Sequence, residues 1–141
     1  MPLVGGGGSP NVTGGSAAGV GSSLNYIGNH AYGYSGTVSI APNSLTSMLK
    51  FNTANNSYVV GTFQLEGDFA QVGNDSIRYQ LLIDSQVIFD TDYSPSNDAQ
   101  YADSPTPILL PPNSSIEIKA THSQGGVNID FQAMIIGEVY A

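Results

Sequence analysis

Residues that could act as acids, bases or nucleophiles are few in this chain of 141 residues. It contains two histidines, His30 and His122, and no cysteine, which excludes thiol nucleophiles, disulfides and cysteine-ligated metals. A serine triad needs a histidine between a serine and a carboxylate, and no Gly-x-Ser-x-Gly elbow accompanies either histidine. We therefore expect no catalytic residues and no enzyme, with both histidines as surface or hydrogen-bonded strand residues. A triad assembled from distant positions is the alternative.

Phosphate and metal sites have little support either. The glycine run at 5–8 lacks the following lysine and hydroxyl residue of a phosphate-binding loop, and His122 with Asp130 does not give zinc-ligand spacing. Five aspartates surround one hairpin and the loop after it: Asp84, Asp90, Asp92, Asp98 and Asp103. Oxygen-rich loops can bind calcium, so a calcium site is the alternative to solvated side chains. We expect no metal and no cofactor.

Tyrosines are the better candidates for binding. Tyr93 and Tyr101 lie in the segment 91–106, which is rich in Asp, Ser, Asn and Tyr, and long loops in compact domains are often functional. A tyrosine combines apolar area with a polar tip, so it can stack on a sugar or anchor a protein partner. We predict Tyr93 and Tyr101 as ligand contacts of an outer loop. Packing within the loop is the alternative.

The charge of the chain excludes two kinds of partner. Its formal net charge is −8, with only Lys50, Arg78 and Lys119 on the basic side, so we expect no binding to nucleic acid or to an anionic membrane. Only 10% of the residues are charged, against about 25% in typical soluble domains. A neutral polar surface suits permanent packing against other subunits, because desolvating charge is costly. A secreted or extremophile β-domain with a similar surface is the alternative.

The amino-terminal segment is the most unusual part of the sequence. The first 49 residues contain no Lys, Arg, Asp or Glu, and residues 1–24 are mostly Gly, Ser, Ala and Val. Such a segment cannot build a core, because glycine loses much backbone entropy and has no side chain to bury. It lacks the basic start and apolar block of a signal peptide. We predict an extended arm over 1–24 that docks on a partner surface, followed by one domain over 25–141.

From Tyr26 onward the apolar residues recur with period two, which is typical of half-buried strands. We predict about eight strands, at 31–34, 36–40, 45–51, 58–66, 77–83, 86–90, 116–121 and 127–140. Between them lie turn residues, including a tight hairpin at Asp84-Ser85. The pattern places Val87 and Phe89 inward, and Val127 inward at the start of the last strand. The fold class is therefore all-β, a jelly-roll-like antiparallel β-sandwich with an extended amino-terminal arm.

The last predicted strand has two apolar faces. Met134, Ile136 and Tyr140 lie on the face opposite to the one that enters the core. We therefore predict that its carboxyl-terminal half is covered on both sides, with a subunit interface supplying the second cover.

The segment 107–119, PILLPPNSSIEIK, contains a short strand, a Pro-Pro-Asn turn and a second strand, and a Gly-Gly turn then leads to a long strand ending IIGEVY. This order resembles the back half of small jelly-roll virion proteins, in particular the capsid decoration or cement proteins of tailed bacteriophages. The glycine-rich arm resembles the extended arms that such proteins lay across neighbouring capsid subunits.

The resemblance implies a structural, non-enzymatic protein on the outer capsid surface of a virion. Its partners would be the major capsid protein and further copies of itself, commonly as a homotrimer. It would stabilise the shell by bridging capsid subunits. The residues implied to bind the capsid are those of the arm and its exit: Leu3, Val4, Val12, Val20 and Tyr26. The alternative function is that of a carbohydrate- or receptor-binding β-sandwich module, with the segment 91–106 contacting the ligand.

Overall fold

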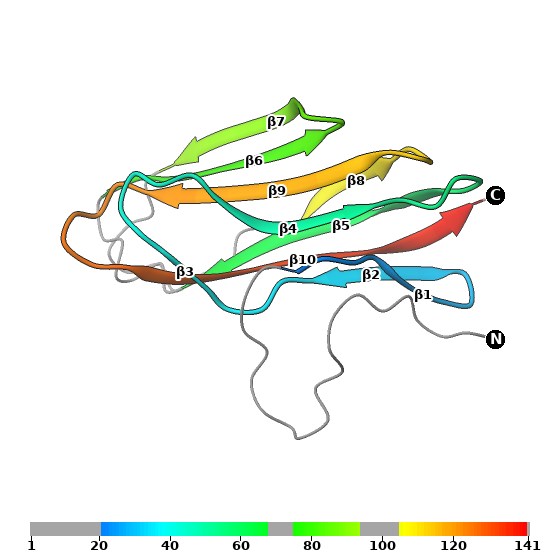
Figure 1. Ribbon diagram of the computed structural model, residues 1–141, viewed down its shortest axis with the longest axis horizontal. Coiled ribbons are helices and arrows are strands. Elements are labelled where there is room, and N and C mark those ends of the chain that lie inside the picture. The colour runs from blue at the N-terminus through cyan, green and yellow to red at the C-terminus, as the bar shows by residue number, and fades with distance from the viewer. Residues whose placement is uncertain (1–20, 68–74, 94–104, 141) are drawn as a thin grey trace, which may run out of the picture.

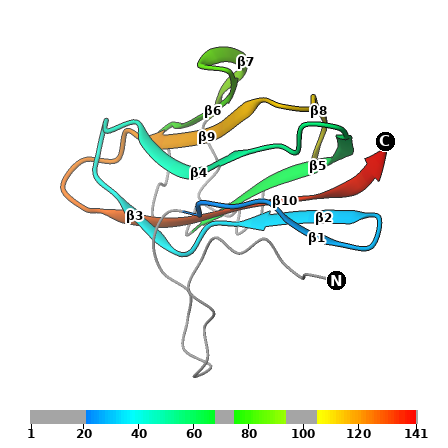
Figure 2. The same ribbon diagram turned by 45° about the vertical axis from the view of Figure 1, so that its right-hand side comes forward.

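The computed structural model describes residues 21–67, 75–93 and 105–140. Within these ranges ten strands form two antiparallel sheets that pack face to face (Figures 1 and 2), which confirms the predicted all-β sandwich. The described residues contain no helix long and apolar enough to span a membrane. The strands are β1 (Asn25–Ile27), β2 (His30–Tyr34), β3 (Val38–Ile40), β4 (Thr46–Asn52), β5 (Tyr58–Gly67), β6 (Ile77–Ile83), β7 (Gln86–Tyr93), β8 (Thr106–Leu110), β9 (Ser115–His122) and β10 (Ile129–Tyr140).

Successive strands along the chain mostly alternate between the two sheets. The six-stranded sheet has the order β1-β2-β10-β5-β8, and β3 pairs with β10 beyond the end of β2. The four-stranded sheet has the order β4-β9-β6-β7. From β3 onward the chain changes sheet at every described strand-to-strand step except the β6–β7 hairpin, which gives the jelly-roll-like character. In Figure 1 β7, β6 and β9 of the four-stranded sheet form the upper layer, and β10 and β2 of the six-stranded sheet lie below them.

All eight predicted strands are present. The short strand before the Pro-Pro-Asn turn is β8, at the edge of the six-stranded sheet. Only β1 has no counterpart in the prediction, because its three residues are too few to show a period-two pattern.

Alternate residues of the long strands meet between the two sheets. Phe63 of β5 contacts Tyr79 of β6 and Phe89 of β7 edge-on, with ring centroids 5.8 and 6.0 Å apart. Edge-to-face pairs of this kind add about 0.5–1.5 kcal/mol to the gain from burial alone. The largest fully buried side chains around them include Leu49, Leu65, Ile77, Leu110, Ile116, Ile118, Ile129, Phe131 and Ile135. This core joins the sheets along most of their length.

The hairpin at Asp84-Ser85 is confirmed, and it changes the pattern of β7. Both turn residues have positive φ, 50° and 67°, as a type I′ turn requires. The inward placement of Val87 is wrong. Leu81 opposes Phe89 but Leu82 opposes Val87, so one extra residue forms a β-bulge that interrupts the alternation. Phe89 therefore packs against the core, while Val87 is 49% exposed.

The inward placement of Val127 is also wrong. The turn after β9 includes Gly126 at a φ of 86°, and the chain enters β10 only at Ile129. Val127 therefore precedes the strand and is exposed. From Ile129 to Ile135 the predicted inward residues are buried, as expected.

Candidate functional site

The predicted arm is held to the sandwich where the two meet. Gly21 lies beside β4, an edge strand of the four-stranded sheet. Its N–H donates to the Met48 carbonyl at 3.1 Å, and its own carbonyl accepts from the Lys50 N–H at 2.9 Å. Leu24 is buried in the core. Residues 21–24 therefore pack as part of the body, and the predicted arm contacts Leu3, Val4, Val12 and Val20 lie outside the described residues.

Position 21 has room only for glycine. A Cβ there would collide with the Tyr34 carbonyl oxygen and with Leu49 Cδ1. The pairing of Gly21 with Leu49 is parallel, so the chain at Gly21 runs in the same direction as β4. The close approach fixes the position of Gly21 between β4 and the Tyr34 carbonyl.

Tyr26, the remaining residue predicted for the arm contact, belongs to β1. Its half-buried ring packs against the core, and its hydroxyl accepts a hydrogen bond from the Ala54 N–H at 3.3 Å. The contact ties the edge of the six-stranded sheet to the connection between β4 and β5. Tyr26 thus anchors the chain immediately after the arm.

Of the two predicted outer-loop contacts, only Tyr93 lies within the described residues. Tyr93 is the last residue of β7, and its backbone pairs with Ile77 of β6. Tyr101 lies outside the described residues. The structure therefore does not bring these two tyrosines together into a described site.

Large apolar side chains gather instead on the outer face of the six-stranded sheet. Seven of the eleven large apolar side chains that are exposed among the described residues lie there, each 41–58% exposed: Ile27, Tyr34, Tyr58, Val60, Leu109, Ile136 and Tyr140. The half-buried Tyr32 and Met134 lie on the same face. We call these nine residues the tyrosine face. Monomeric proteins rarely expose contiguous apolar patches beyond a few hundred Å², and larger ones mark interaction sites.

The strand register brings the tyrosines into neighbouring pairs. Tyr58 and Tyr140 oppose each other across β5 and β10, with ring centroids 6.0 Å apart and planes 19° from parallel. Tyr32 and Tyr34 lie 5.5 Å apart on β2. The Tyr140 hydroxyl donates to Glu138 Oε2 at 2.9 Å, and this bond to a carboxylate raises the pKa of the Tyr140 phenol.

The sequence pattern showed only part of this face. The apolar second face of the last strand, Met134, Ile136 and Tyr140, is the central portion. Its neighbours Val60 and Leu109 come from strands remote in sequence and join it through the β10–β5–β8 pairing. No single strand carries enough of these residues to reveal the patch.

The opposite outer face of the sandwich is charged. All three basic residues lie on strands of the four-stranded sheet, Lys50 on β4, Arg78 on β6 and Lys119 on β9. The strands of the six-stranded sheet carry three carboxylates at outward positions, Glu66, Asp130 and Glu138, and no basic residue. The two outer faces therefore differ in charge as well as in apolar content.

The best-formed ion pair stands on the charged face. Arg78 donates to both Asp90 oxygens, Nε to Oδ1 at 3.0 Å and Nη2 to Oδ2 at 2.7 Å, and Gln80 Nε2 donates to Oδ2 at 3.0 Å. The hydrogen bond from Arg78, with that from Gln80, lowers the pKa of Asp90 to about 2. The pair lies in solvent, so its effect on folding is small.

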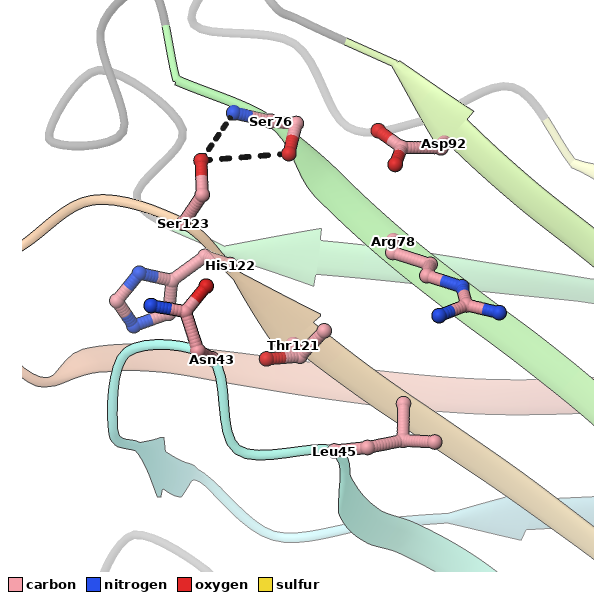
Figure 3. Close-up of a pocket in the computed structure, with 8 residues that line it drawn as sticks. All are labelled: Asn43, Leu45, Ser76, Arg78, Asp92, Thr121, His122 and Ser123. Atoms are coloured by element: carbon pink, nitrogen blue, oxygen red, sulfur yellow. Dashed lines mark hydrogen bonds between the residues drawn. The ribbon is translucent and has the colours of Figure 1, made fainter.

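A shallow polar pocket of about 270 Å³ lies at one end of this charged face (Figure 3). Its lining is Asn43, Leu45, Ser76, Arg78, Asp92, Thr121, His122 and Ser123. Ser123 Oγ accepts from the Ser76 N–H at 2.8 Å and lies 3.3 Å from Ser76 Oγ. The two hydroxyls therefore bond to each other and to backbone, which holds β6 to the end of β9.

His122 serves the packing of the sandwich. Its ring is 1% exposed, and Nε2 donates to the Ile40 carbonyl at 2.8 Å, since a carbonyl can only accept. Nδ1 is buried without a hydrogen-bond partner. Because neither ring nitrogen contacts a hydroxyl, His122 does not activate Ser76 or Ser123 in this arrangement. His30 lies exposed at the start of β2, opposite Glu138.

The aspartates considered for calcium have separate roles where they are described. Asp84 Oδ1 accepts from the Ser115 N–H at 2.8 Å at the hairpin tip, Asp90 binds Arg78, and Asp92 borders the pocket. Asp98 and Asp103 lie outside the described residues. Among residues 21–67, 75–93 and 105–140, no group of three or more acidic or histidine side chains is placed to hold a metal ion.

No protein-family model and no curated protein matches this sequence. A β-glucosidase from Paenibacillus barengoltzii is similar in structure with a TM-score of 0.35 and 14% identity, over 91% of this chain and 12% of the glucosidase chain. A family 35 carbohydrate-binding module from Clostridium thermocellum has a TM-score of 0.34 and 14% identity, over 88% of this chain and 83% of the module. Likenesses of this size carry no argument about function.

The anchoring of the arm predicts an effect of a side chain at position 21. Gly21→Val should lower the free energy of unfolding by about 1–3 kcal/mol, because the new Cβ collides with backbone and core. Urea denaturation followed by circular dichroism measures the change. The matched control is Gly125→Val, since a Cβ at Gly125 meets open space and should change stability by less than about 0.5 kcal/mol. Equal effects of the two variants would show that Gly21 is not seated as described.

The Arg78–Asp90 pair predicts a stability term that depends on pH. The folded-state pKa of Asp90, about 2, lies below its ordinary value of 3.8, so the stabilisation is complete above about pH 4 and is lost as the pH falls toward about 2. Asp90→Asn should therefore be less stable than the native chain at neutral pH and equal to it in acid. A double-mutant cycle with Arg78→Gln, measured by urea denaturation across this range, isolates the pair. A coupling energy that does not fall with pH would contradict the assignment.

Proposed function

We propose that this chain is a non-catalytic structural protein of a virion: a capsid decoration protein that binds the outer capsid surface and stabilises the shell by bridging capsid subunits. The observation that carries the proposal is the anchored arm. An uncharged segment of 20 residues, rich in glycine, precedes a junction at Gly21 that is hydrogen-bonded to β4 and followed by the buried Leu24. A rigid body thus holds one end of a segment that cannot fold by itself.

The chemistry of the arm suits docking along another protein. Its backbone groups can hydrogen-bond to an exposed strand or groove, its glycines allow close approach, and Leu3, Val4, Val12 and Val20 supply apolar contacts. Ordering such a segment costs entropy, which the contacts made on docking must exceed. The absence of charge lowers the cost of removing water from it.

The length of the arm suits bridging. Twenty extended residues reach about 65 Å, whereas β10, the longest strand of the body with 12 residues, spans about 40 Å. An arm of this reach extends past the footprint of its own body. It can therefore join a neighbouring capsid subunit to the one on which the body rests.

Deletion of the arm tests the proposal. A chain that begins at Gly21 keeps the β4 pairing and Leu24, so it should unfold like the full chain but lose binding to capsids. Cosedimentation with capsids purified from the producing host and stripped of this chain measures the binding. A full-length variant with Leu3, Val4, Val12 and Val20 changed to Ser is the control that separates apolar contacts from length, and we expect it to bind more weakly.

Two outcomes would reject capsid decoration. One is saturation of the capsids by the shortened chain with unchanged affinity. The other is the absence of a fixed ratio between this chain and the major capsid subunit in purified particles, measured by quantitative mass spectrometry.

Binding of carbohydrate is the second candidate, favoured by one observation. The exposed rings of Tyr58 and Tyr140 are 19° from parallel, and exposed aromatic rings offer apolar faces on which sugars can stack. Under this function Tyr58→Ala should abolish retardation in native gels containing soluble polysaccharides, while Tyr34→Ala, elsewhere on the same face, should retain it. Migration of the native chain that no polysaccharide slows would dismiss this candidate.

A further inference from the structure

The tyrosine face is large enough to form a specific interface by itself. Five strands spaced about 4.8 Å apart span about 24 Å with their side chains, and the outward residues of β10 from Met134 to Tyr140 extend about 20 Å. The face therefore covers about 500 Å² in projection. Two such faces in contact bury about 1,000 Å² in total, the lower bound for a specific protein–protein interface. The face therefore has the dimensions of one small but complete interface.

Its chemistry is that of an interface core. Tyrosine, methionine and isoleucine lie at the centre, and Thr62 and Gln64 lie at outward positions beside them. Aromatic residues and methionine are enriched at interfaces, and charged residues are depleted at the interface core. The one central carboxylate, Glu138, already accepts a hydrogen bond from Tyr140 and lies opposite His30.

The distribution of charge over the chain favours a second copy of this chain as the partner. The net charge of the chain is −8, but none of the nine residues of the tyrosine face is charged. Two of the three outward carboxylates of this sheet, Glu66 and Asp130, lie beyond the face, toward the other end of β5 and β10. Two copies of such a chain repel each other least where neither presents many carboxylates. Contact through the tyrosine faces also leaves the charged sides, with Lys50, Arg78 and Lys119, in water on the two outer surfaces.

We propose that the tyrosine face is a homodimer interface in which a second copy of this chain packs its own tyrosine face around Ile136. A single face that meets itself is isologous and closes with two-fold symmetry. Face-to-face packing of sheets at about 10 Å is already the way the two sheets of one chain meet. The proposal gives a two-fold dimer where the resemblance to decoration proteins implies a trimer, and it does not depend on what the arm binds.

The mass of the full chain in solution tests the proposal. Size-exclusion chromatography with light scattering at micromolar concentration should give twice the 14.7 kDa of one chain. Ile136→Glu and Val60→Glu should each weaken the dimer by about 30-fold or more, the effect of losing a central apolar anchor. Circular dichroism and urea denaturation show that each variant is folded before its mass is interpreted.

The chain supplies matched controls for both variants on the opposite sheet. Ile88→Glu and Val87→Glu make the same substitutions at residues 60% and 49% exposed, against 45% and 46% for Ile136 and Val60. They should leave the dimer intact. If the controls dissociate the dimer as strongly as the test variants, charge alone is responsible and the interface is wrong.

Other outcomes would overturn the proposed dimer interface without bearing on capsid decoration. A monomeric native chain rejects the interface, and a trimer that Ile136→Glu dissociates rejects the two-fold arrangement. The chain beginning at Gly21 should remain dimeric; a monomer there would show that residues 1–20, and not the second face, make the contact. If the chain beginning at Gly21 loses capsid binding but remains a dimer, the dimer interface is supported independently of the arm.

Discussion

The register between β10 and β5 is the constraint on which both surfaces of this molecule depend. Ten consecutive residue pairs join the two strands, from Phe131 opposite Gly67 to Tyr140 opposite Tyr58. Side chains alternate between the two sides of a strand, so this register sends Phe131 and Ile135 into the core and places Ile136 outside. A slip by one residue would exchange the two sets and bury Glu138. The core and the tyrosine face are therefore two consequences of one set of backbone hydrogen bonds.

The two outer faces of the sandwich are suited to different surroundings. The four-stranded sheet carries every basic residue of the chain, including Arg78 in its bond with Asp90, and charges of this kind are best left in water. The tyrosine face of the six-stranded sheet presents uncharged, largely apolar side chains that lose little when water is removed. The proposed dimer and the anchored arm use these properties together. Two bodies joined through their tyrosine faces would present two arms, and under the proposed capsid decoration the attachment of one arm would raise the effective concentration of the other at the capsid.

The fold could be predicted from the sequence to a large extent, because burial between two sheets imposes period-two alternation on each long strand. Phe63 and Ile118 are buried as that pattern requires. The failures have local causes. Val87 is exposed because a β-bulge interrupts the alternation of β7, and β1 is too short to carry a pattern. The seating of Gly21 against the Tyr34 carbonyl has no signal in a run of glycines and serines, so the end of the arm could not be located from composition.

The features of the candidate surfaces likewise divide into those that the sequence shows and those that only the tertiary structure creates. The uncharged amino terminus, the shortage of basic residues and the apolar second side of the last strand are properties of the sequence alone, since each is a matter of composition or of spacing within one strand. The tyrosine face exists only in the tertiary structure. Ile27, Val60 and Leu109 are distant in sequence, and they share one face because β1, β5 and β8 join the same sheet as β10. Strand order depends on contacts between remote segments, and no local pattern specifies it.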